Sequence, residues 1–367
     1  MDFILYLEAH QPRRLRGIPP LKLGEADDLL DVELDRSLFE KVAERCYRPL
    51  LKLVEASEDG LKLALKVSGT LLEQMEAWGS DLLESLKSLV SAGRVELVAG
   101  PYYHSIASLI APEELVEQTR MHVDLIDELM GVRPKVFSNP FLIYDDRVGQ
   151  LVSEELGMSV VIAEGSPRVL GWRAPSYVYK SPASETRLLL RDYRLSDEVS
   201  FGLGRGYVRA DSYATRVSRI EGQVVVVGLP AETFGEFIPA EAGAFEFLKW
   251  LPRELSKYPR ERLSTPSEAA SKYEPVDELA VSQPVSWLEG KDLSALTGSP
   301  LQVAALEILR ELRVKALSSG LARAWRLLSQ ADLLYSMRAS MGVFLKFERA
   351  ACSLRSSIAA RSLTSKA

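Results

Sequence analysis

The sequence predicts an α/β protein in which a parallel sheet or barrel is covered by helices and is followed by a helical C-terminal unit. Short apolar, β-branched runs alternate with amphipathic stretches, which is the order of elements in such folds. The strand pattern stops near Glu268, and helical patterns follow it. We therefore expect a strand-containing domain over residues 1–267 and a helical region over residues 268–367.

Seven segments have the composition of strands, at residues 3–9, 62–68, 95–99, 135–138, 159–163, 188–193 and 224–229. The clearest helical pattern between them, 113–130, begins after Pro112 with two acidic residues, as helix N-termini prefer. In the C-terminal unit, residues 301–317 and 321–337 have the helical period. The Arg/Ser/Ala-rich tail after them is expected to fray.

The composition excludes several classes of protein. Of the 367 residues, 26% are charged and 47% are hydrophobic, so the chain is neither disordered nor fibrous. The net charge of -6 provides no positive field for a phosphate backbone, so nucleic acid is not an expected partner. No apolar run reaches the roughly 18 residues of a membrane span, and the N-terminal apolar run is too short for a signal peptide. We expect a cytoplasmic protein with no membrane partner.

Side-chain amides are scarce and Arg and Glu are abundant, a composition that favours a thermophilic source organism. The two cysteines, Cys46 and Cys352, make neither a disulfide framework nor a metal knuckle. No cofactor is expected. The glycine-rich run at 202–206 follows no strand, so it is a weak phosphate-binding candidate and is expected to be a flexible loop.

Active sites of α/β barrels lie at the C-terminal ends of the strands, so the residues that follow each predicted strand are candidates for the active site. They include His10 and His104, two of the chain's three histidines, with Tyr103 beside the second. Such residues, with Trp172 and scattered acids, suit a sugar, whose hydroxyls need hydrogen bonds and whose C–H faces contact aromatic rings. Trp172 is the tryptophan expected to stack on it, and core packing is the expected role of the others, Trp287 and Trp325.

Eight segments, in order along nearly the whole chain, resemble glycoside hydrolase family 57, in its short archaeal α-amylase-like branch. They are EAHQP (8–12), VELVAGPYYHSIASL (95–109), KVFSNPFLIYDD (135–146), AEGSPRVLGWRAPSYVY (163–179), RDYRLSD (191–197), ETFGEF (232–237), EPVDEL (274–279) and LLSQADLLYSM (327–337). The resemblance implies a seven-stranded (β/α) barrel followed by a helical region, and a site for α-linked glucans. It also implies a retaining mechanism with a Glu nucleophile and an Asp acid/base.

The chain departs from the family pattern where the chemistry should be. The nucleophile lies in a pattern like NTELIY, and residues 139–144 read NPFLIY, so Phe141 occupies the nucleophile position. The acid/base lies in a pattern like MDYETFGEH, and Pro230 occupies its position here. Gly100 replaces the acid of an AET triplet, and Phe237 replaces the His after GE. We expect Phe141 and Phe237 to fill part of the former sugar subsite.

Two functions follow from these departures. The first is an inactive homologue that binds α-glucan or maltooligosaccharide weakly, or that acts as a partner subunit, in an oligomer or beside an active relative. The second is an active α-glucan hydrolase or 4-α-glucanotransferase that uses relocated carboxylates. The candidate acids for the second are Glu8, Glu164, Glu232 and Asp332. The candidate sugar contacts are His10, Tyr103, His104, Trp172 and Asp332. No spacing pattern joins His10, His104 and Asp332 into a metal site, so no metal is expected.

Overall fold

A closed barrel of seven parallel strands forms the body of the protein. The structure is a computed structural model, and it describes residues 1–364. The strands of the barrel are β1 (Asp2–Ala9), β2 (Leu63–Val67), β3 (Val95–Ala99), β4 (Val136–Phe137), β5 (Val160–Glu164), β7 (Arg187–Arg191) and β8 (Val224–Pro230). Each overlaps one of the seven predicted segments, so the predicted α/β barrel is confirmed.

The strand order closes the sheet on itself. Strands β1 to β5 pair in sequence, β5 pairs with β7, and β8 pairs with both β7 and β1. Alternate residues face the interior, where Ile4 and Tyr6 pack, while Phe3 and Leu5 pack outward against the helices. Both faces of each strand are therefore buried, which explains why the strands are apolar runs.

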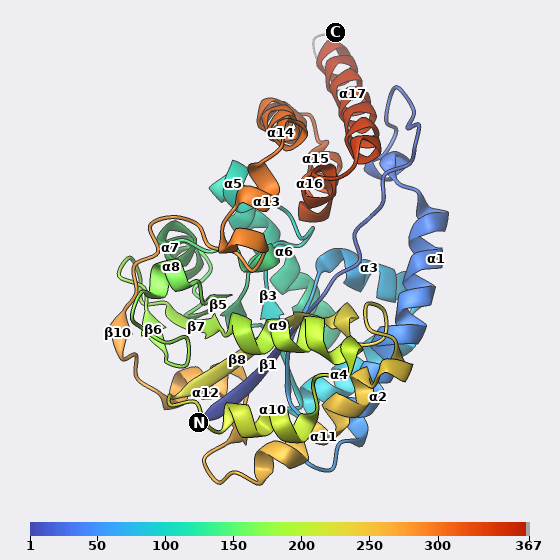
Figure 1. Cartoon of the computed structure of the whole chain (residues 1–367). Helices are drawn as coiled ribbons and strands as arrows, with labels where there is room; N and C mark the ends of the chain where they lie inside the picture. The colour runs from blue at the N-terminus through green and yellow to red at the C-terminus, as the bar shows by residue number, and fades with distance from the viewer. Residues whose placement is uncertain (365–367) are drawn as a thin grey trace.

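Helices surround the barrel between the strands (Figure 1). Their bounds are α1 (Val32–Val42), α2 (Arg48–Ala56), α3 (Gly69–Trp78), α4 (Ser80–Ser91), α5 (Ala107–Ile110), α6 (Pro112–Met130), α7 (Asp146–Glu154), α8 (Pro167–Leu170), α9 (Tyr193–Gly202), α10 (Ala210–Val217), α11 (Ala244–Ser256) and α12 (Pro266–Lys272). Helix α6 matches the predicted one. It begins with Pro112 and two acids in its first turn, and it ends at Gly131 in the left-handed conformation.

Within residues 1–364, three short strands lie outside the barrel. They are β6 (Tyr179–Lys180), antiparallel to β7, β9 (Arg262–Leu263), beside β1, and β10 (Asp277–Glu278), beside β6. The prediction that no strand follows Glu268 is therefore wrong, because the two-residue strand β10 lies beyond it. Beyond it, the backbone of Tyr144 pairs with that of Val285, so the chain from α12 to about Val285 still follows the barrel.

The helical region is made of α13 (Ser294–Thr297), α14 (Pro300–Ser318), α15 (Ala322–Leu328), α16 (Ala331–Met337) and α17 (Met341–Thr364). The predicted single helix over 321–337 is wrong, because Gln330 is extended and separates α15 from α16. The fraying tail is also wrong for the described residues. Phe347, Leu354 and Ile358 recur at helical spacing along α17 and are buried against the other C-terminal helices.

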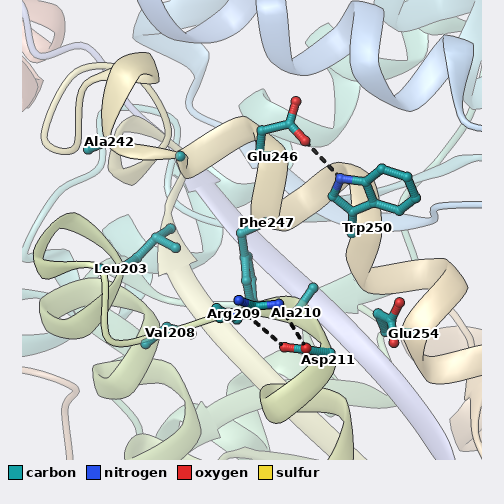
Figure 2. A pocket seen from close by; sticks show the side chains of 12 residues that line it. Leu203, Val208, Arg209, Ala210, Asp211, Ala242, Glu246, Phe247, Trp250 and Glu254 are labelled. Atoms are coloured by element: carbon teal, nitrogen blue, oxygen red, sulfur yellow. Dashed lines mark hydrogen bonds and ion pairs between the residues drawn. The ribbon is translucent and has the colours of Figure 1, made fainter.

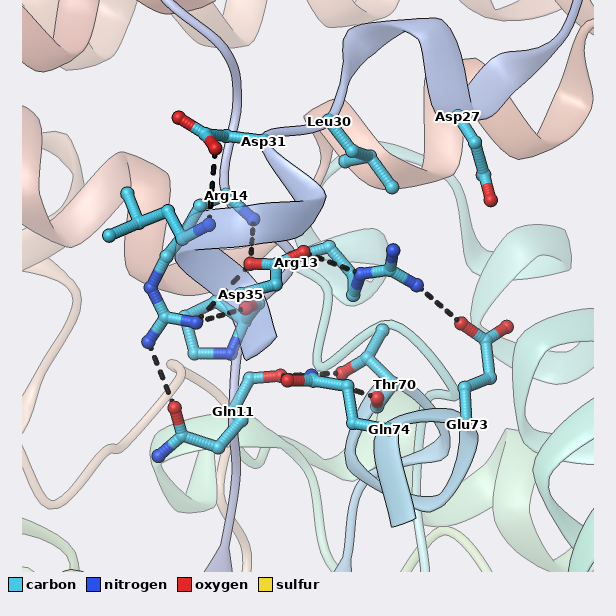
Figure 3. A network of polar contacts seen from close by, with 12 residues as sticks. Gln11, Arg13, Arg14, Asp27, Leu30, Asp31, Asp35, Thr70, Glu73 and Gln74 are labelled. Atoms are coloured by element: carbon cyan, nitrogen blue, oxygen red, sulfur yellow. Dashed lines mark hydrogen bonds and ion pairs between the residues drawn. The ribbon is translucent and has the colours of Figure 1, made fainter. Parts of the chain in front are cut away.

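The C-terminal helices lie across the end of the barrel at which the strands finish (Figure 1). Gln330 attaches them, since its side-chain oxygen accepts from the Arg13 backbone N–H at 2.7 Å and its backbone bridges to Ser105. The Arg13 guanidinium in turn pairs with the buried Asp35 at 2.8 Å and with Glu73 at 3.1 Å (Figure 3). The mouth of the barrel is thereby closed on one side by residues from both ends of the chain. No helix in residues 1–364 is long and apolar enough to cross a membrane.

Candidate functional site

A layer of charged side chains fills the barrel interior just below its mouth. In register, Glu8 on β1 is opposite Lys66 on β2, and Glu164 on β5 is opposite Arg191 on β7. All four side chains are buried. The Lys66 ammonium lies 3.4 Å from Glu8, and the Arg191 guanidinium lies 3.1 Å from Glu164. Buried charges persist only when they are paired, so this layer is built from two ion pairs.

His104, in the loop after β3, joins the charged layer to the C-terminal helices. Its Nε2 hydrogen-bonds Glu8, and its Nδ1 lies 3.0 Å from Asp332 Oδ2 on α16. The His10 ring, at the end of β1, stacks on the His104 ring with centroids 4.0 Å apart, and its Nε2 lies 2.8 Å from the same Asp332 oxygen. His10, His104 and Asp332 therefore meet at one point, whereas the sequence separates them widely.

The two histidines differ in charge. Burial, with the neighbouring His104, lowers the pKa of His10 to about 4, so its ring is neutral near pH 7. Burial also opposes charge on His104, but the Glu8 and Asp332 carboxylates outweigh it and raise the pKa of His104 to about 8. Burial likewise disfavours the Glu8 carboxylate, yet Lys66 and His104 lower the pKa of Glu8 to about 2. Glu8 is therefore an ionised acid held between two cations.

Phe141, which the resemblance aligns with the nucleophile, lies in the turn after β4, beside this cluster. Its ring meets the His104 ring edge-on at 5.5 Å and lies 5.7 Å from the Tyr335 ring. Its φ of 55° is in the left-handed region. In residues 1–364, four non-glycine residues have positive φ, and all of them lie around the mouth: His104, Phe141, Leu142 and Lys291. Such backbone strain tends to cluster at binding sites.

Pro230, which the resemblance aligns with the acid/base, borders an open cleft of about 580 Å³ at the ends of β7 and β8. Aromatic rings of Phe237, Trp287 and Tyr335 line this cleft together with the charged groups of Arg191 and Lys291. Phe237, expected to fill part of the former subsite, borders this cleft and is 65% exposed. Residues 232–238 form a tight loop in which Ile238 is buried, and this leaves Phe237 at the edge of the cleft.

Glu232 follows β8 but does not line the cleft. Its buried carboxylate accepts the backbone N–H of His10 at 3.1 Å and the hydroxyl of Tyr47. Burial raises the pKa of Glu232 to about 7, in spite of these hydrogen bonds. This acid therefore holds the end of β1 in place and is half protonated near neutral pH.

Two of the predicted sugar contacts are not at this site. Tyr103 is 1% exposed and packs beside Tyr102 under α15, where no surface of its ring remains for a ligand. Trp172 is 86% exposed in the loop after α8 and stands outside the cleft. Trp287, expected in the core, lines the cleft instead, with the Arg191 guanidinium 5.7 Å from its ring centre. Trp325 is fully buried, as expected.

Sequence reasoning missed Lys66. The predicted strand over 62–68 places this charged side chain at an interior position, and that mismatch was the available signal.

A second hollow, of about 460 Å³, lies between α10 and α11 (Figure 2). The glycine-rich run contributes to it with a 3-10 turn at Leu203–Arg205, followed by Gly206. Arg209 at its edge is paired with Asp211, and Glu246 and Glu254 also line it. The acids outnumber the free cations there, so the hollow does not suit a phosphate.

Comparison with known proteins identifies the barrel. Residues 4–282 match the sequence profile described as Glycosyl hydrolase family 57. The chain belongs to glycosyl hydrolase family 57. A provisionally named alpha-amylase of Methanocaldococcus jannaschii is 35% identical over 319 residues, which is 83% of this chain and 68% of that protein.

Two solved structures share the family 57 fold. The alpha-amylase AmyC of Thermotoga maritima has a TM-score of 0.71 at 15% identity, covering 100% of this chain and 94% of that one. The 4-alpha-glucanotransferase of Thermococcus litoralis has a TM-score of 0.62 at 20% identity, covering 89% of this chain. The chain spans only 48% of that glucanotransferase. The two structures show the fold, and the family match supports a carbohydrate-active function.

Proposed function

We propose that this protein binds α-glucan in the cleft beside Pro230 and does not cleave it by the mechanism that the family resemblance implies. The observation that supports this most is the pair Phe141 and Pro230, at the ends of β4 and β8. Retaining hydrolysis needs two carboxyl groups about 5–5.5 Å apart, one to attack the anomeric carbon and one to protonate the leaving oxygen. A phenyl ring cannot attack, and a proline side chain cannot transfer a proton.

The cleft itself supports sugar binding. Trp287, Tyr335 and Phe237 offer ring faces for the C–H surfaces of glucose, and Asp197 and Lys291 offer groups for its hydroxyls. Lys291 is also paired with Asp197 and Glu164, at 3.7 and 3.4 Å, so these groups exchange one partner for another when a sugar binds. We therefore expect weak, millimolar-range affinity.

Calorimetric titration with maltooligosaccharides, beside a sensitive reducing-end assay at high temperature, tests both halves of the proposal. We expect saturable binding and no reducing sugar above the blank. Trp287→Ala should weaken binding by about 2–10-fold, the value of one aromatic contact, whereas Trp172→Ala should leave it unchanged. Equal affinity in wild type and Trp287→Ala, with both folded, would place the glucan elsewhere and contradict the proposal.

A relocated-acid enzyme is the second candidate, and one observation favours it. The Glu8 and Asp332 carboxylates flank opposite edges of the His104 ring, so two acids and an imidazole share one site. Against it, Glu8 is buried and paired with Lys66, and Glu164 is buried and paired with Arg191. Turnover that survives repurification and disappears in Asp332→Asn would establish this candidate in place of the first.

A role beside an active family relative in the cytoplasm is another form of the proposal. It is tested by size-exclusion chromatography of this protein mixed with such a relative. Co-elution together with a change in the relative's rate on maltooligosaccharides would support it, and independent elution would reject it.

A further inference from the structure

Three side chains that can bind a metal ion converge at the mouth of the barrel. The ligand atoms of His10, His104 and Asp332 all lie within 4.8 Å of one another. They come from the end of β1, the loop after β3 and helix α16, so the sequence carries no metal motif at these residues. The convergence depends on the contacts that attach α16 to the barrel, among them the hydrogen bond from the Ala331 backbone N–H to the His104 carbonyl at 2.9 Å.

Each imidazole has one nitrogen held by a neighbour and the other directed to Asp332. Ser68 Oγ lies 2.8 Å from His10 Nδ1, and Glu8 binds His104 Nε2. The opposite nitrogens, His10 Nε2 and His104 Nδ1, lie 2.8 and 3.0 Å from Asp332 Oδ2. Histidines that ligate metals are usually oriented in this way, by a hydrogen bond from the second ring nitrogen to a carboxylate or another polar group.

We propose that His10 Nε2, His104 Nδ1 and the Asp332 carboxylate bind one divalent ion of the Zn²⁺ class. Two imidazoles and one carboxylate match the preferences of Zn²⁺, whereas Mg²⁺ and Ca²⁺ prefer oxygen ligands. Zn²⁺ lies about 2.0–2.2 Å from such ligands, so the Asp332 oxygen withdraws slightly from the ring nitrogens to admit it.

The fourth position of this site is open to solvent on the side of Asp332. The Asp332 side chain is 34% exposed, while those of His10 and His104 are 7% and 4% exposed. Tyr335, one helical turn along α16, lines the cleft. Three protein ligands with one open position are the arrangement of Zn²⁺ sites that bind water or a substrate oxygen. The site is independent of glucan binding, because it needs no residue of the cleft.

Calorimetric titration of the full chain with ZnCl₂, without sugar and without a histidine tag, tests the proposal. A Cys352→Ser background removes the exposed thiol, which could bind Zn²⁺ by itself. We expect one Zn²⁺ per chain, an affinity at least 100-fold lower in His10→Gln and in Asp332→Asn, and one about 10–100-fold lower in Ser68→Ala. Asp124→Asn, at an exposed acid on α6, is the matched control and should bind as the parent does.

Thermal melting confirms that each variant is folded before it is titrated. Titration of the parent protein with Co²⁺ supplies a second measurement. Visible d–d absorption that appears only when the protein is present reports coordination of Co²⁺ by imidazole and carboxylate. The proposal is overturned if the folded parent shows no saturable Zn²⁺ binding, if binding persists in both His10→Gln and Asp332→Asn, or if Mg²⁺ binds as tightly as Zn²⁺. Any of these results leaves the glucan proposal intact, since that is measured without metal.

Discussion

Replacing Glu232 by glutamine should stabilise the protein at alkaline pH and change little at acidic pH. The pKa of Glu232 is about 7 in the folded protein, against 4.5 for an unperturbed glutamate. As pH rises, the unfolded chain therefore loses this proton first, and the free energy of unfolding falls between pH 4.5 and 7 and is constant above. The difference between the two pKa values corresponds to about 2–4 kcal/mol.

The glutamine in Glu232→Gln keeps the oxygen that accepts from His10 and Tyr47, so the variant should lose the titration and keep the contacts. With an unfolding entropy of about 2.1 cal/mol/K per residue, a chain of 367 residues gains about 3–5 °C in melting temperature for 2–4 kcal/mol. Calorimetric scans of the wild type and of Glu232→Gln at about pH 4.5 and about pH 8 measure the difference in melting temperature. An equal difference at the two pH values would refute the reasoning, because it would show that Glu232 is not the titrating group. The same variant should also be assayed for turnover, since loss of a real activity would mean that Glu232 is a catalytic acid.

Three further outcomes follow from the site. Phe141→Ala should lower the melting temperature by about 2–3 °C, because a half-buried ring loses about half of the 3–5 kcal/mol of a buried Phe→Ala change. An unchanged melting temperature would show that the packing of this ring contributes nothing to stability. Phe141→Glu combined with Pro230→Asp should not restore hydrolysis in the reducing-end assay, because the resemblance also places polar groups at positions 100 and 237, where this chain has Gly100 and Phe237. Recovery to ordinary glycosidase rates would contradict this. Gly100→Ala should destabilise the protein by about 1–3 kcal/mol in denaturant titration, because its Cβ would lie 2.4 Å from the Ser138 carbonyl oxygen; a neutral result would mean that β4 shifts freely.

The barrel could be predicted from the sequence because its strands are buried on both faces and are flanked by helices. Local pattern was enough for all seven barrel strands and for α6. It failed where a tertiary contact decides the backbone. Gln330 is extended because it bonds to Arg13 and Ser105. Residues 321–337 alone carry no signal for this break between α15 and α16. The tail after Met337 failed for a related reason, since its small residues form a helix only when Phe347 and Leu354 have a surface to pack on.

The candidate site was only partly accessible to the same reasoning. Strand ends and family motifs located His10, His104 and Asp332, but their convergence depends on how α16 docks on the barrel. Which tryptophan can contact a ligand depends on where the fold places it, and residue type alone does not predict that. Trp172 projects into solvent, while Trp287 lines the cleft.

The side chain of Lys66 has a consequence for what position 100 can hold. A Cβ at position 100, where the resemblance places an acid, would lie 2.7 Å from the Lys66 Cε and 3.0 Å from its ammonium. Any side chain added at Gly100 must therefore shift the far end of a lysine that also pairs with Glu8. The firmer obstacle is the Ser138 carbonyl oxygen, 2.4 Å from such a Cβ, because backbone yields less readily than the far end of a lysine side chain. Removing Lys66 would leave Glu8 with His104 as its remaining partner inside the barrel. A side chain at position 100 therefore requires the backbone after β4 to move together with the Lys66 side chain.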